Sequence, residues 1–135
     1  LIPLMITRAL QDRPLPIYGD GLHVRDWIHV TDHCRGLLAA VEKGTPGKVY
    51  NFGGDTERTN LSVVKEILQI MDRPSDSIQH VQDRLGHDRR YAIDSSRAQS
   101  ELGWEPSIAF SDGLRETMDW YVTNQSWWQN PNCND

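Results

Sequence analysis

The sequence predicts a mixed α/β domain with short strands and about five helices. Two observations lead to this fold class. In several segments apolar residues recur at the three- and four-residue spacing of a helix face, and between these segments lie short stretches rich in Ile, Val, Tyr and Trp. The size agrees with one domain, because 135 residues, 38% of them hydrophobic and 24% charged, are enough for a single core.

An N-terminal helix is predicted over residues 2–11, followed by two short strands. Prolines after this segment end the helix, and Asp20-Gly21 is a turn signal between stretches whose composition suits strands. The apolar positions of the helix are Ile2, Met5, Ile6, Ala9 and Leu10.

A second helix is predicted over residues 30–44. Thr31 or Asp32 can cap its first turn, and Gly44 can end it. Residues 48–54, KVYNFGG, are expected to form a short strand whose apolar run can be buried. The apolar stripe of the helix consists of Cys34, Leu37, Leu38 and Val41.

The second half of the chain has the clearest helix signal, over residues 59–72, with Asn60 as a natural N-cap. Residues 77–83 favour a strand, and an arginine-rich loop follows it. A short helix closed by Gly103 and a final helix over residues 111–124 complete the domain. The apolar stripes of the two longer helices are Val64, Ile67, Leu68 and Met71 in the first and Leu114, Met118 and Tyr121 in the last.

The composition argues against several classes of partner. A formal net charge of -5 and a pI near 5.5 are not those of a nucleic-acid binder or a membrane-surface binder, and no apolar run is long enough to span a bilayer. The two cysteines, Cys34 and Cys133, do not form a metal-type pair and indicate a reduced, cytoplasmic setting. Because the chain opens on apolar residues without an initiator methionine, we expect it to be part of a longer protein.

The segment DRLGHDRRYAID, residues 83–94, concentrates charged side chains in a predicted surface loop. Arg84, Arg89 and Arg90, together with His87, offer planar, multidentate donors that suit phosphate oxygens. A glycine within the loop allows the backbone to approach a ligand closely. The alternative is that the arginines form solvated salt bridges with acidic groups, and composition alone favours this alternative.

Three further residues allow both a structural and a ligand-binding interpretation. Arg25 places a charge in an apolar strand, so if it is buried it needs an anionic partner, either a ligand phosphate or a carboxylate other than Asp26, which lies on the opposite strand face. Asn60 is either a helix cap, which the bare sequence favours, or an amide that contacts a ligand. Tyr18 either stacks on a ring or packs against the protein.

The chain by itself shows no evident catalytic centre. It contains no G-x-G-x-x-G or P-loop sequence, and no tyrosine is followed four residues later by a lysine. His29 and His33 are four residues apart, but the predicted helix begins between them and the glutamate of the zinc-protease motif is absent, so we expect no metal site.

Several segments together resemble one family. Five segments resemble, in order and approximate spacing, segments of the C-terminal part of the dTDP-glucose 4,6-dehydratases. These enzymes belong to the extended short-chain dehydrogenase/reductase superfamily. The five segments are PLPIYGDGLHVRDWIHVTDHCRGL, GKVYNFGG, TNLSVVKEIL, DRLGHDRRYAID and ELGWEPSIAFSDGLRETMDWY. The resemblance extends to about residue 128, and its most specific parts are GHDRRYAID and WYVTNQSWW. With this resemblance, the ligand-binding interpretation of the loop outweighs the salt-bridge alternative.

The resemblance implies a lyase of deoxysugar biosynthesis in which an NAD-binding Rossmann domain precedes a smaller domain for the nucleotide sugar. Such an enzyme oxidises C4 of dTDP-glucose, eliminates water across C5 and C6, and returns the hydride to C6, which yields dTDP-4-dehydro-6-deoxyglucose. The family's Gly-rich fingerprint, Tyr-x-x-x-Lys pair and acid/base residues would precede Leu1, so the chain would lack most of the Rossmann domain and be inactive alone. Residues 1–128 would form the substrate-binding domain and residues 129–135 a polar tail.

The resemblance also implies a set of substrate-binding residues. Residues 16–18 match the wall of the nucleoside pocket, Arg25 matches a diphosphate-contacting arginine, and residues 83–87 match a loop that closes over the diphosphate and the sugar. The full set is Pro16, Ile17, Tyr18, Arg25, Asn60, Asp83, Arg84, Gly86, His87 and Tyr91. One departure is Leu85, which stands where the family usually has proline and leaves the loop more mobile.

The resemblance finally implies how the chain associates. In the family, residues corresponding to 30–54 pack on the Rossmann side, and homodimers form mainly through the Rossmann domain. Without that side, the apolar stripe of the helix over residues 30–44 would lose part of its cover, so we expect this chain to self-associate. The alternatives are a part of another NAD-dependent nucleotide-sugar epimerase or decarboxylase, and a non-catalytic binding or assembly module. The sequence does not decide between thymidine and uridine.

Overall fold

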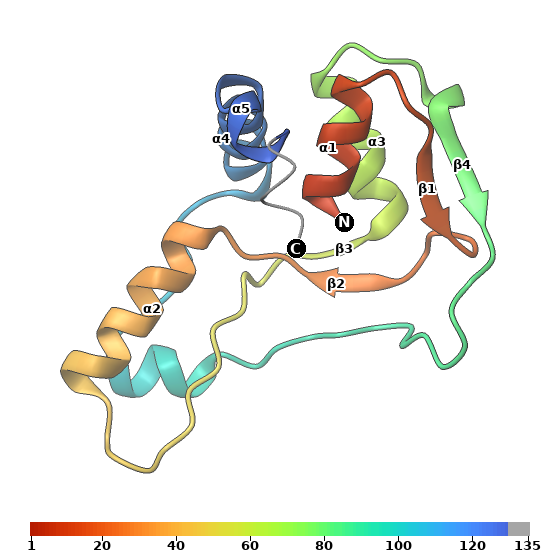
Figure 1. Cartoon of the computed structure of the whole chain (residues 1–135). Coiled ribbons are helices and arrows are strands. Elements are labelled where there is room, and N and C mark those ends of the chain that lie inside the picture. The colour runs from red at the N-terminus through yellow and green to blue at the C-terminus, as the bar shows by residue number, and fades with distance from the viewer. Residues whose placement is uncertain (130–135) are drawn as a thin grey trace.

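The chain folds into two packed groups of elements that are joined by extended segments (Figure 1). The computed structural model describes residues 1–129. The first group contains β1 (Leu15–Tyr18), β4 (Ile78–Val81), α1 (Ile2–Leu10), α3 (Asn60–Ile70), the short 3-10 helix η1 (Ser75–Ser77), α4 (Phe110–Thr123) and α5 (Gln125–Trp128). The second group contains α2 (Val30–Lys43) and the π-helix η2 (Ala98–Leu102), and the chain passes between the groups through β2 (Val24–Asp26) and β3 (Glu57–Thr59). The structure is therefore mixed α/β, as predicted.

The short strands pair with distant partners instead of their neighbours in sequence. β1 runs parallel to β4, with Leu15 opposite Ile78 and Tyr18 opposite Val81, and β2 runs antiparallel to β3. The strands predicted on either side of the turn at residues 20–21 are present, but that turn does not join a hairpin. This pairing gathers residues 15–26 with two segments from the middle of the chain.

The larger core fills the space between α1, α3, α4 and β1. The faces predicted from apolar spacing are the faces that these helices bury, which confirms the three long helix predictions in this group. Because burial of an Ile, Leu or Val side chain contributes roughly 1.5–3 kcal/mol, this core is the main source of stability in the group. Its buried members are Met5, Ile6, Ala9, Leu15, Ile17, Val63, Val64, Ile67, Leu68, Leu114 and Met118.

A smaller core lies between α2 and η2. It is built from Ala98, Leu102 and Trp104, with Tyr50 and Phe52 packed against it. α2 approaches this core closely through Gly36, where a Cβ atom would lie 2.6 Å from the ring of Phe52. Gly103 ends η2 in the left-handed conformation, with φ 64°, as expected for a helix-ending glycine.

Asp32 ties α2 to the segment that leads into α4. Its carboxylate is fully buried and accepts hydrogen bonds from the backbone N–H groups of Ser107 and Ile108, both at 2.9 Å, and from the Ser107 hydroxyl at 3.0 Å. Arg35 forms an ion pair with the same carboxylate. Burial by itself raises the pKa of Asp32, but the hydrogen bonds from Ile108 and Ser107 and the charge of Arg35 outweigh burial and lower the pKa below its ordinary value.

The predicted caps of two helices are wrong by one or more residues. α2 is capped by His29, whose Nδ1 accepts from the N–H of Thr31, because Asp32 is already engaged with residues 107–108. α3 is capped by Thr59, whose hydroxyl accepts from the N–H of Ser62 at 3.1 Å. Asn60 is consequently the first residue of α3, and its side chain is not used as a cap.

The strand predicted over KVYNFGG is also wrong. The segment is extended, but it forms no ladder with any other segment of residues 1–129, and a strand requires a partner to accept its backbone hydrogen bonds. Its apolar run is divided, because Val49 is exposed while Phe52 packs against the smaller core. The hydroxyl of Tyr50 donates to Glu101 at 2.9 Å.

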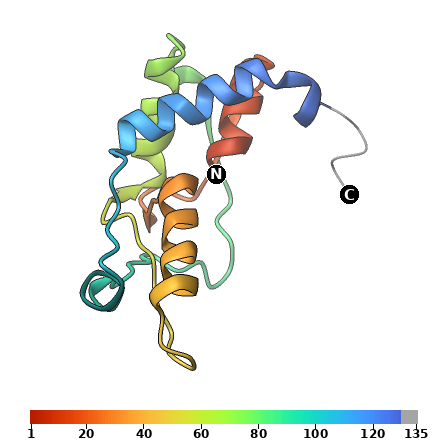
Figure 2. The same ribbon diagram turned by 90° about the vertical axis from the view of Figure 1, so that its left-hand side faces the viewer.

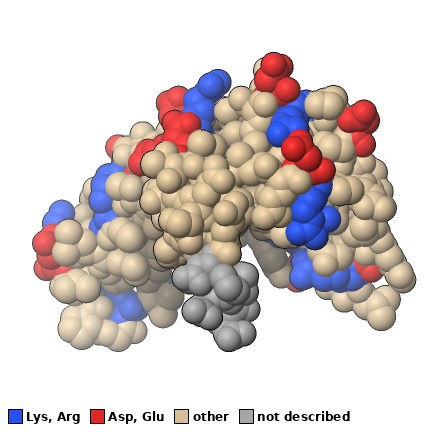
Figure 3. Space-filling view, turned by 45° about the horizontal axis from the view of Figure 1, so that its top comes forward, with Lys and Arg blue, Asp and Glu red and all other residues tan. Residues whose placement is uncertain are grey.

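The apolar stripe of α2 is exposed in this structure. Leu37, Leu38 and Val41 expose half or more of their surface, and Cys34 is exposed beside them. Figure 2 shows α2 facing the viewer, with no described element covering it on that side. On the face shown in Figure 3, acidic and basic side chains are interspersed around an area without charged residues. Cys133 lies outside the described residues, and no helix among residues 1–129 is long and apolar enough to cross a membrane.

Substitution of Asp32 tests the link between the two groups. We expect Asp32→Ala to lower the free energy of unfolding by about 3 kcal/mol, because three donors and the Arg35 charge lose their acceptor. Since the pKa of Asp32 is lower in the folded chain than its ordinary value of 3.8, its contribution is complete above that pH and is lost as the pH falls below it. Urea unfolding at neutral and acid pH measures this difference. Asp119→Ala, an exposed carboxylate on α4, is the control and is expected to change stability by less than about 0.5 kcal/mol.

Candidate functional site

A cleft of about 350 Å³ lies beside β1 and β2. Its walls come from α1, the two strands, the first residue of α3 and the loop after β4. One side is apolar and the other carries side chains that donate hydrogen bonds, a combination typical of small-molecule sites. The lining residues are Leu1, Leu4, Met5, Pro16, Ile17, Tyr18, Arg25, Trp27, Asn60, Arg84 and His87.

Arg25 extends into this cleft from β2 and is half-buried. Its guanidinium donates to the carbonyl of Val24 at 2.6 Å and to Nε2 of His87 at 3.0 Å, and it lies 4.4 Å from the centre of the Tyr91 ring. Among residues 1–129 no carboxylate forms an ion pair with it. Asp26, next in the strand, instead accepts from the N–H groups of Gly54 and Thr56, at 3.1 and 2.9 Å, so the expectation that it does not pair with Arg25 is confirmed.

The arginines of the loop fall into two classes. Arg89 forms a bidentate pair with Asp20, with N···O distances of 2.8 and 2.9 Å, and Arg90 forms a bidentate pair with Glu57, at 2.5 and 2.6 Å. The hydrogen bond from Arg89 lowers the pKa of Asp20 to about 2. Arg84, in contrast, has no carboxylate partner among the described residues; it donates to His87 and lies 5.1 Å from the centre of the Tyr18 ring. The salt-bridge interpretation therefore holds for Arg89 and Arg90 but not for Arg84.

His87 joins the two unpaired arginines. Nη2 of Arg25 and Nη2 of Arg84 lie 3.0 and 2.9 Å from the same atom, Nε2 of His87. A guanidinium can only donate, so this nitrogen carries a lone pair and the ring proton is on Nδ1. Nδ1 donates to Asp83 at 2.7 Å, and this hydrogen bond is the largest of the effects that lower the pKa of Asp83.

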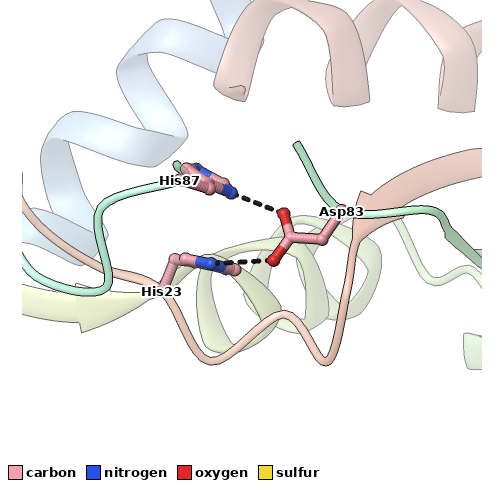
Figure 4. Close-up of side chains that lie close together, drawn as sticks. All are labelled: His23, Asp83 and His87. Atoms are coloured by element: carbon pink, nitrogen blue, oxygen red, sulfur yellow. Dashed lines mark hydrogen bonds and ion pairs between the residues drawn. The ribbon is translucent and has the colours of Figure 1, made fainter. Parts of the chain in front are cut away.

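Asp83 has a second histidine partner, His23, which sequence reasoning missed. Figure 4 shows the carboxylate between the two rings, with one oxygen facing each. Nε2 of His23 lies 3.2 Å from Oδ2 of Asp83. His23 precedes Arg25 by two positions in an extended segment, and the alternation of side chains along such a segment is the signal that could have placed both on one face.

His23, Asp83 and His87 offer potential ligand atoms within 4.8 Å of one another. A metal ion on Nδ1 of His87 would move the ring proton to Nε2, where two guanidinium groups already donate. The hydrogen bonds of this cluster therefore fit protons and not a metal ion, and we assign no metal site to it.

The structure brings most of the predicted binding residues together. Seven of them line the cleft: Pro16, Ile17, Tyr18, Arg25, Asn60, Arg84 and His87. Asp83 and Tyr91 lie one layer behind, against His87 and Arg25, and Gly86 does not line the cleft. Gly86 has φ 69° in a tight turn closed by the hydrogen bond from the N–H of His87 to the carbonyl of Arg84, at 3.3 Å. The side chains from α1 and Trp27 were not predicted, since apolar residues of an amphipathic helix give no signal for a ligand.

The geometry specifies recognition of an anion that carries an apolar or ring-shaped group. Two cations converge here without a carboxylate from the described part of the chain, an amide lies at the start of α3, and the opposite wall is formed by apolar side chains. Phosphate esters have the charge and the acceptor oxygens that such converging guanidinium groups recognise.

Similar proteins share both this sequence and this fold. The dTDP-glucose 4,6-dehydratase of Xanthomonas campestris pv. campestris (strain ATCC 33913) is 50% identical over 138 residues, which cover 96% of this chain and 39% of that protein. Among solved structures, the dTDP-glucose 4,6-dehydratase of Bacillus anthracis str. Ames in complex with NAD is 50% identical, with a TM-score of 0.91 over 96% of this chain and 41% of the other. DesIV, the dTDP-glucose 4,6-dehydratase of Streptomyces venezuelae with NAD and TYD bound, is 42% identical, with a TM-score of 0.93 over 96% and 40%.

The chain thus spans about two fifths of the length of the curated relatives it matches. A sequence profile of one family, described as GDP-mannose 4,6 dehydratase, matches residues 1–117. This match covers most of the chain and includes every residue of the cleft. The chain therefore belongs to the GDP-mannose 4,6 dehydratase family.

Proposed function

We propose that this chain is the nucleotide-sugar-binding part of a dTDP-glucose 4,6-dehydratase. The observation that carries the proposal is the convergence of Arg25 and Arg84 on one cleft without a carboxylate partner among residues 1–129. Two guanidinium groups match the charge of a diphosphate, and each charge-assisted hydrogen bond contributes on the order of 1.5–3 kcal/mol. The high identity to dTDP-glucose 4,6-dehydratases supports dTDP-glucose as the ligand.

The other residues of the cleft take complementary roles in this proposal. Pro16, Ile17 and Tyr18 form the wall against which the nucleoside packs, and Asn60 donates its amide to the ligand. The turn that contains Gly86 carries Arg84 and His87 over the diphosphate. Asp83 and Tyr91 hold His87 and Arg25 from behind and do not contact the ligand themselves in this arrangement.

In the whole protein, this part would bind the sugar nucleotide while other residues carry out the lyase reaction that yields dTDP-4-dehydro-6-deoxyglucose. NAD would be the cofactor of the longer protein and would supply its hydride-transfer chemistry. The residues of this chain do not fit an NAD site, because the sequence has no G-x-G-x-x-G and its adjacent glycines, Gly53 and Gly54, are packed against other groups: a Cβ at Gly54 would lie 1.7 Å from the carbonyl oxygen of Trp27. We assign no residue of this chain to the cofactor or to the proton transfers.

The exposed stripe of α2 has a place in the same proposal. We infer that α2 and residues 44–54 pack against the remainder of the longer protein, which would form a homodimer. In the isolated chain the stripe would instead be covered by a second copy, because a contiguous apolar surface favours association.

Nucleotide titration of the 135-residue chain tests the binding proposal. We expect dTDP to bind, and Arg25→Ala or Arg84→Ala to weaken binding tenfold or more, by about the value of one charge-assisted hydrogen bond. Isothermal titration calorimetry with dTDP and, in parallel, UDP measures affinity and base preference. Arg89→Ala is the matched control, since Arg89 lies in the same loop but is neutralised by Asp20. Loss of binding in the control equal to that in Arg84→Ala would contradict the proposal, and so would the absence of dTDP binding.

The turn at Leu85 gives a second prediction. Gly86, with φ 69°, occupies the third position of a turn from Arg84 to His87, which matches a type II turn, and proline is favoured at the position of Leu85. We expect Leu85→Pro to tighten dTDP binding by about two- to fivefold, because it restricts the loop before the ligand binds. Leu85→Ala, which truncates the same fully exposed side chain without fixing φ, should leave the affinity unchanged. Weaker binding by the proline variant would show that the turn is of another type.

The α2 stripe gives a third prediction, on association. Light scattering after gel filtration should give a mass above the 15.5 kDa of one chain, and Leu38→Lys combined with Val41→Lys should restore the monomer because charges in the stripe oppose its burial. The control is Leu85→Lys, a similar change at a fully exposed leucine outside the stripe. A monodisperse monomer for the unmodified chain would contradict the expectation.

A further inference from the structure

His23 is a buried polar residue that the binding proposal does not use. It is only 2% exposed, and its Nδ1 has no hydrogen-bond partner among the described residues. Its ring is stacked on that of His87, with centroids 3.8 Å apart and an interplanar angle of 19°. Burial of an imidazole with one unsatisfied nitrogen costs free energy, so a simply apolar residue would fill the space more favourably. We therefore expect His23 to have a role that depends on its other ring nitrogen, Nε2.

That nitrogen faces Asp83. Nε2 of His23 lies 3.2 Å from Oδ2, while the other carboxylate oxygen accepts from Nδ1 of His87 at 2.7 Å and from the N–H of Arg84 at 2.9 Å. A carboxylate only accepts, so the proton in this 3.2 Å ion-pair contact lies on Nε2 of His23. Each oxygen of Asp83 therefore faces one histidine, Oδ2 facing His23 and Oδ1 facing His87 (Figure 4).

The backbone beside Asp83 leaves room for its carboxylate. Gly19 lies under it with φ 55°, and a Cβ atom there would come within 2.8 Å of Oδ2. The N–H of Gly19 donates to the carbonyl of Val81 at 3.0 Å, which fixes this glycine to the end of β4. Because Gly19 has no Cβ atom, the carboxylate of Asp83 can lie close to the backbone at this point, between the two histidines.

Charged groups surround the rings of His23 and His87, so the nitrogen that carries the proton in each ring determines which of these groups the ring can bind. His87 faces Asp83 and Arg84 from its own loop, His23 and Arg25 from the segment around β2, and Tyr18 from β1. Near His23, beyond Asp83 and His87, lies Asp20, which is already paired with Arg89. Asp83 is thus the only carboxylate in contact with either ring among the described residues, and it acts together with the two guanidinium groups at Nε2 in setting which nitrogen of His87 carries the proton.

We propose that His23 is a positioning residue for the anion site: through Asp83 it keeps the proton of His87 on Nδ1, which leaves Nε2 free to hold Arg25 and Arg84 together. This inference rests on the proposed nucleotide-binding function, because it assigns the two arginines to one ligand. Without the donor from His23, the carboxylate of Asp83 is free to turn, the His87 proton is no longer confined to Nδ1, and a proton on Nε2 would repel both guanidinium groups.

Two substitutions separate the donor of His23 from its ring. His23→Phe retains an aromatic ring for the stack but cannot donate, whereas His23→Gln places an amide N–H near the position of Nε2. We expect dTDP to bind about tenfold more weakly to the phenylalanine variant, a loss of about 1.4 kcal/mol, and within about twofold of the original affinity to the glutamine variant. His33→Phe, at an exposed histidine of α2, is the matched control and should bind as the unmodified chain does.

A ring-nitrogen spectrum gives the readout that a purely structural role would not change. Long-range ¹H–¹⁵N correlation distinguishes the two tautomers of a histidine ring without any nucleotide. The unmodified chain and the glutamine variant should show His87 protonated on Nδ1, and the phenylalanine variant a mixture. In the background of His87→Ala, His23→Phe should weaken dTDP binding no further, since the residue through which it acts is gone.

The outcomes distinguish this inference from the binding proposal. If the unmodified chain binds dTDP and His23→Phe binds equally well, or binds weakly with an unchanged His87 tautomer, the positioning role is wrong and the binding proposal stands. If the unmodified chain does not bind dTDP, both are wrong, whatever the tautomer. Should His23→Phe fail to fold, Asp83→Ala interrupts the same series of hydrogen bonds at a half-exposed residue, and an unchanged His87 tautomer in that variant would overturn the inference.

Discussion

Parallel pairing of β1 with β4 places the end of β4 beside Gly19, and the geometry of the cleft follows from that placement. Gly19 donates to Val81 at 3.0 Å and its carbonyl lies 2.7 Å from Nδ1 of His80, so the loop that begins at residue 82 starts at a fixed point. Its other end is held equally well, because Val24 of β2 exchanges backbone hydrogen bonds with residues 89 and 91, at 2.8 and 3.1 Å. A loop anchored at both ends loses less conformational entropy when a ligand binds, and this is the physical basis of preorganised recognition.

The same pairing explains why charge alone did not identify the binding arginines. Four arginines converge on this region, and two of them are neutralised by carboxylates that are 33 and 69 residues distant in sequence. Those carboxylates, Asp20 and Glu57, are brought to the loop by β1, β2 and β3. The composition shows that this acidic protein has enough carboxylates to pair with every arginine. Only the three-dimensional arrangement determines which arginines form an ion pair with a carboxylate. The two that receive none from residues 1–129 are Arg25 and Arg84, and they share the cleft.

Local patterns predicted the helices well because a helix satisfies its own backbone. The apolar spacing of α1, α3 and α4 corresponds to the faces that they bury, and Gly44 and Gly103 end their helices as expected. The failures lie where a side chain or a strand has a distant partner. Asp32 is not a cap because residues 107–108 use its carboxylate, and KVYNFGG is not a strand because none of residues 1–129 pairs with it. Resemblance to a family supplied most of the cleft residues, but it did not supply His23, whose importance depends on a stacking contact with a residue 64 positions away.

Two aspartates illustrate how one kind of group serves stability and recognition differently. Asp32 is fully buried and accepts hydrogen bonds from two backbone N–H groups and one hydroxyl, so its loss leaves several donors without their acceptor and the fold depends on it. The side chain of Asp83 is 38% exposed, so water can replace either histidine when the loop moves. Local opening at Asp83 is consequently far less costly than at Asp32, and a site that must admit and release a charged ligand requires that difference. The fold is held by the carboxylate that cannot be solvated, and the cleft is shaped by the one that can.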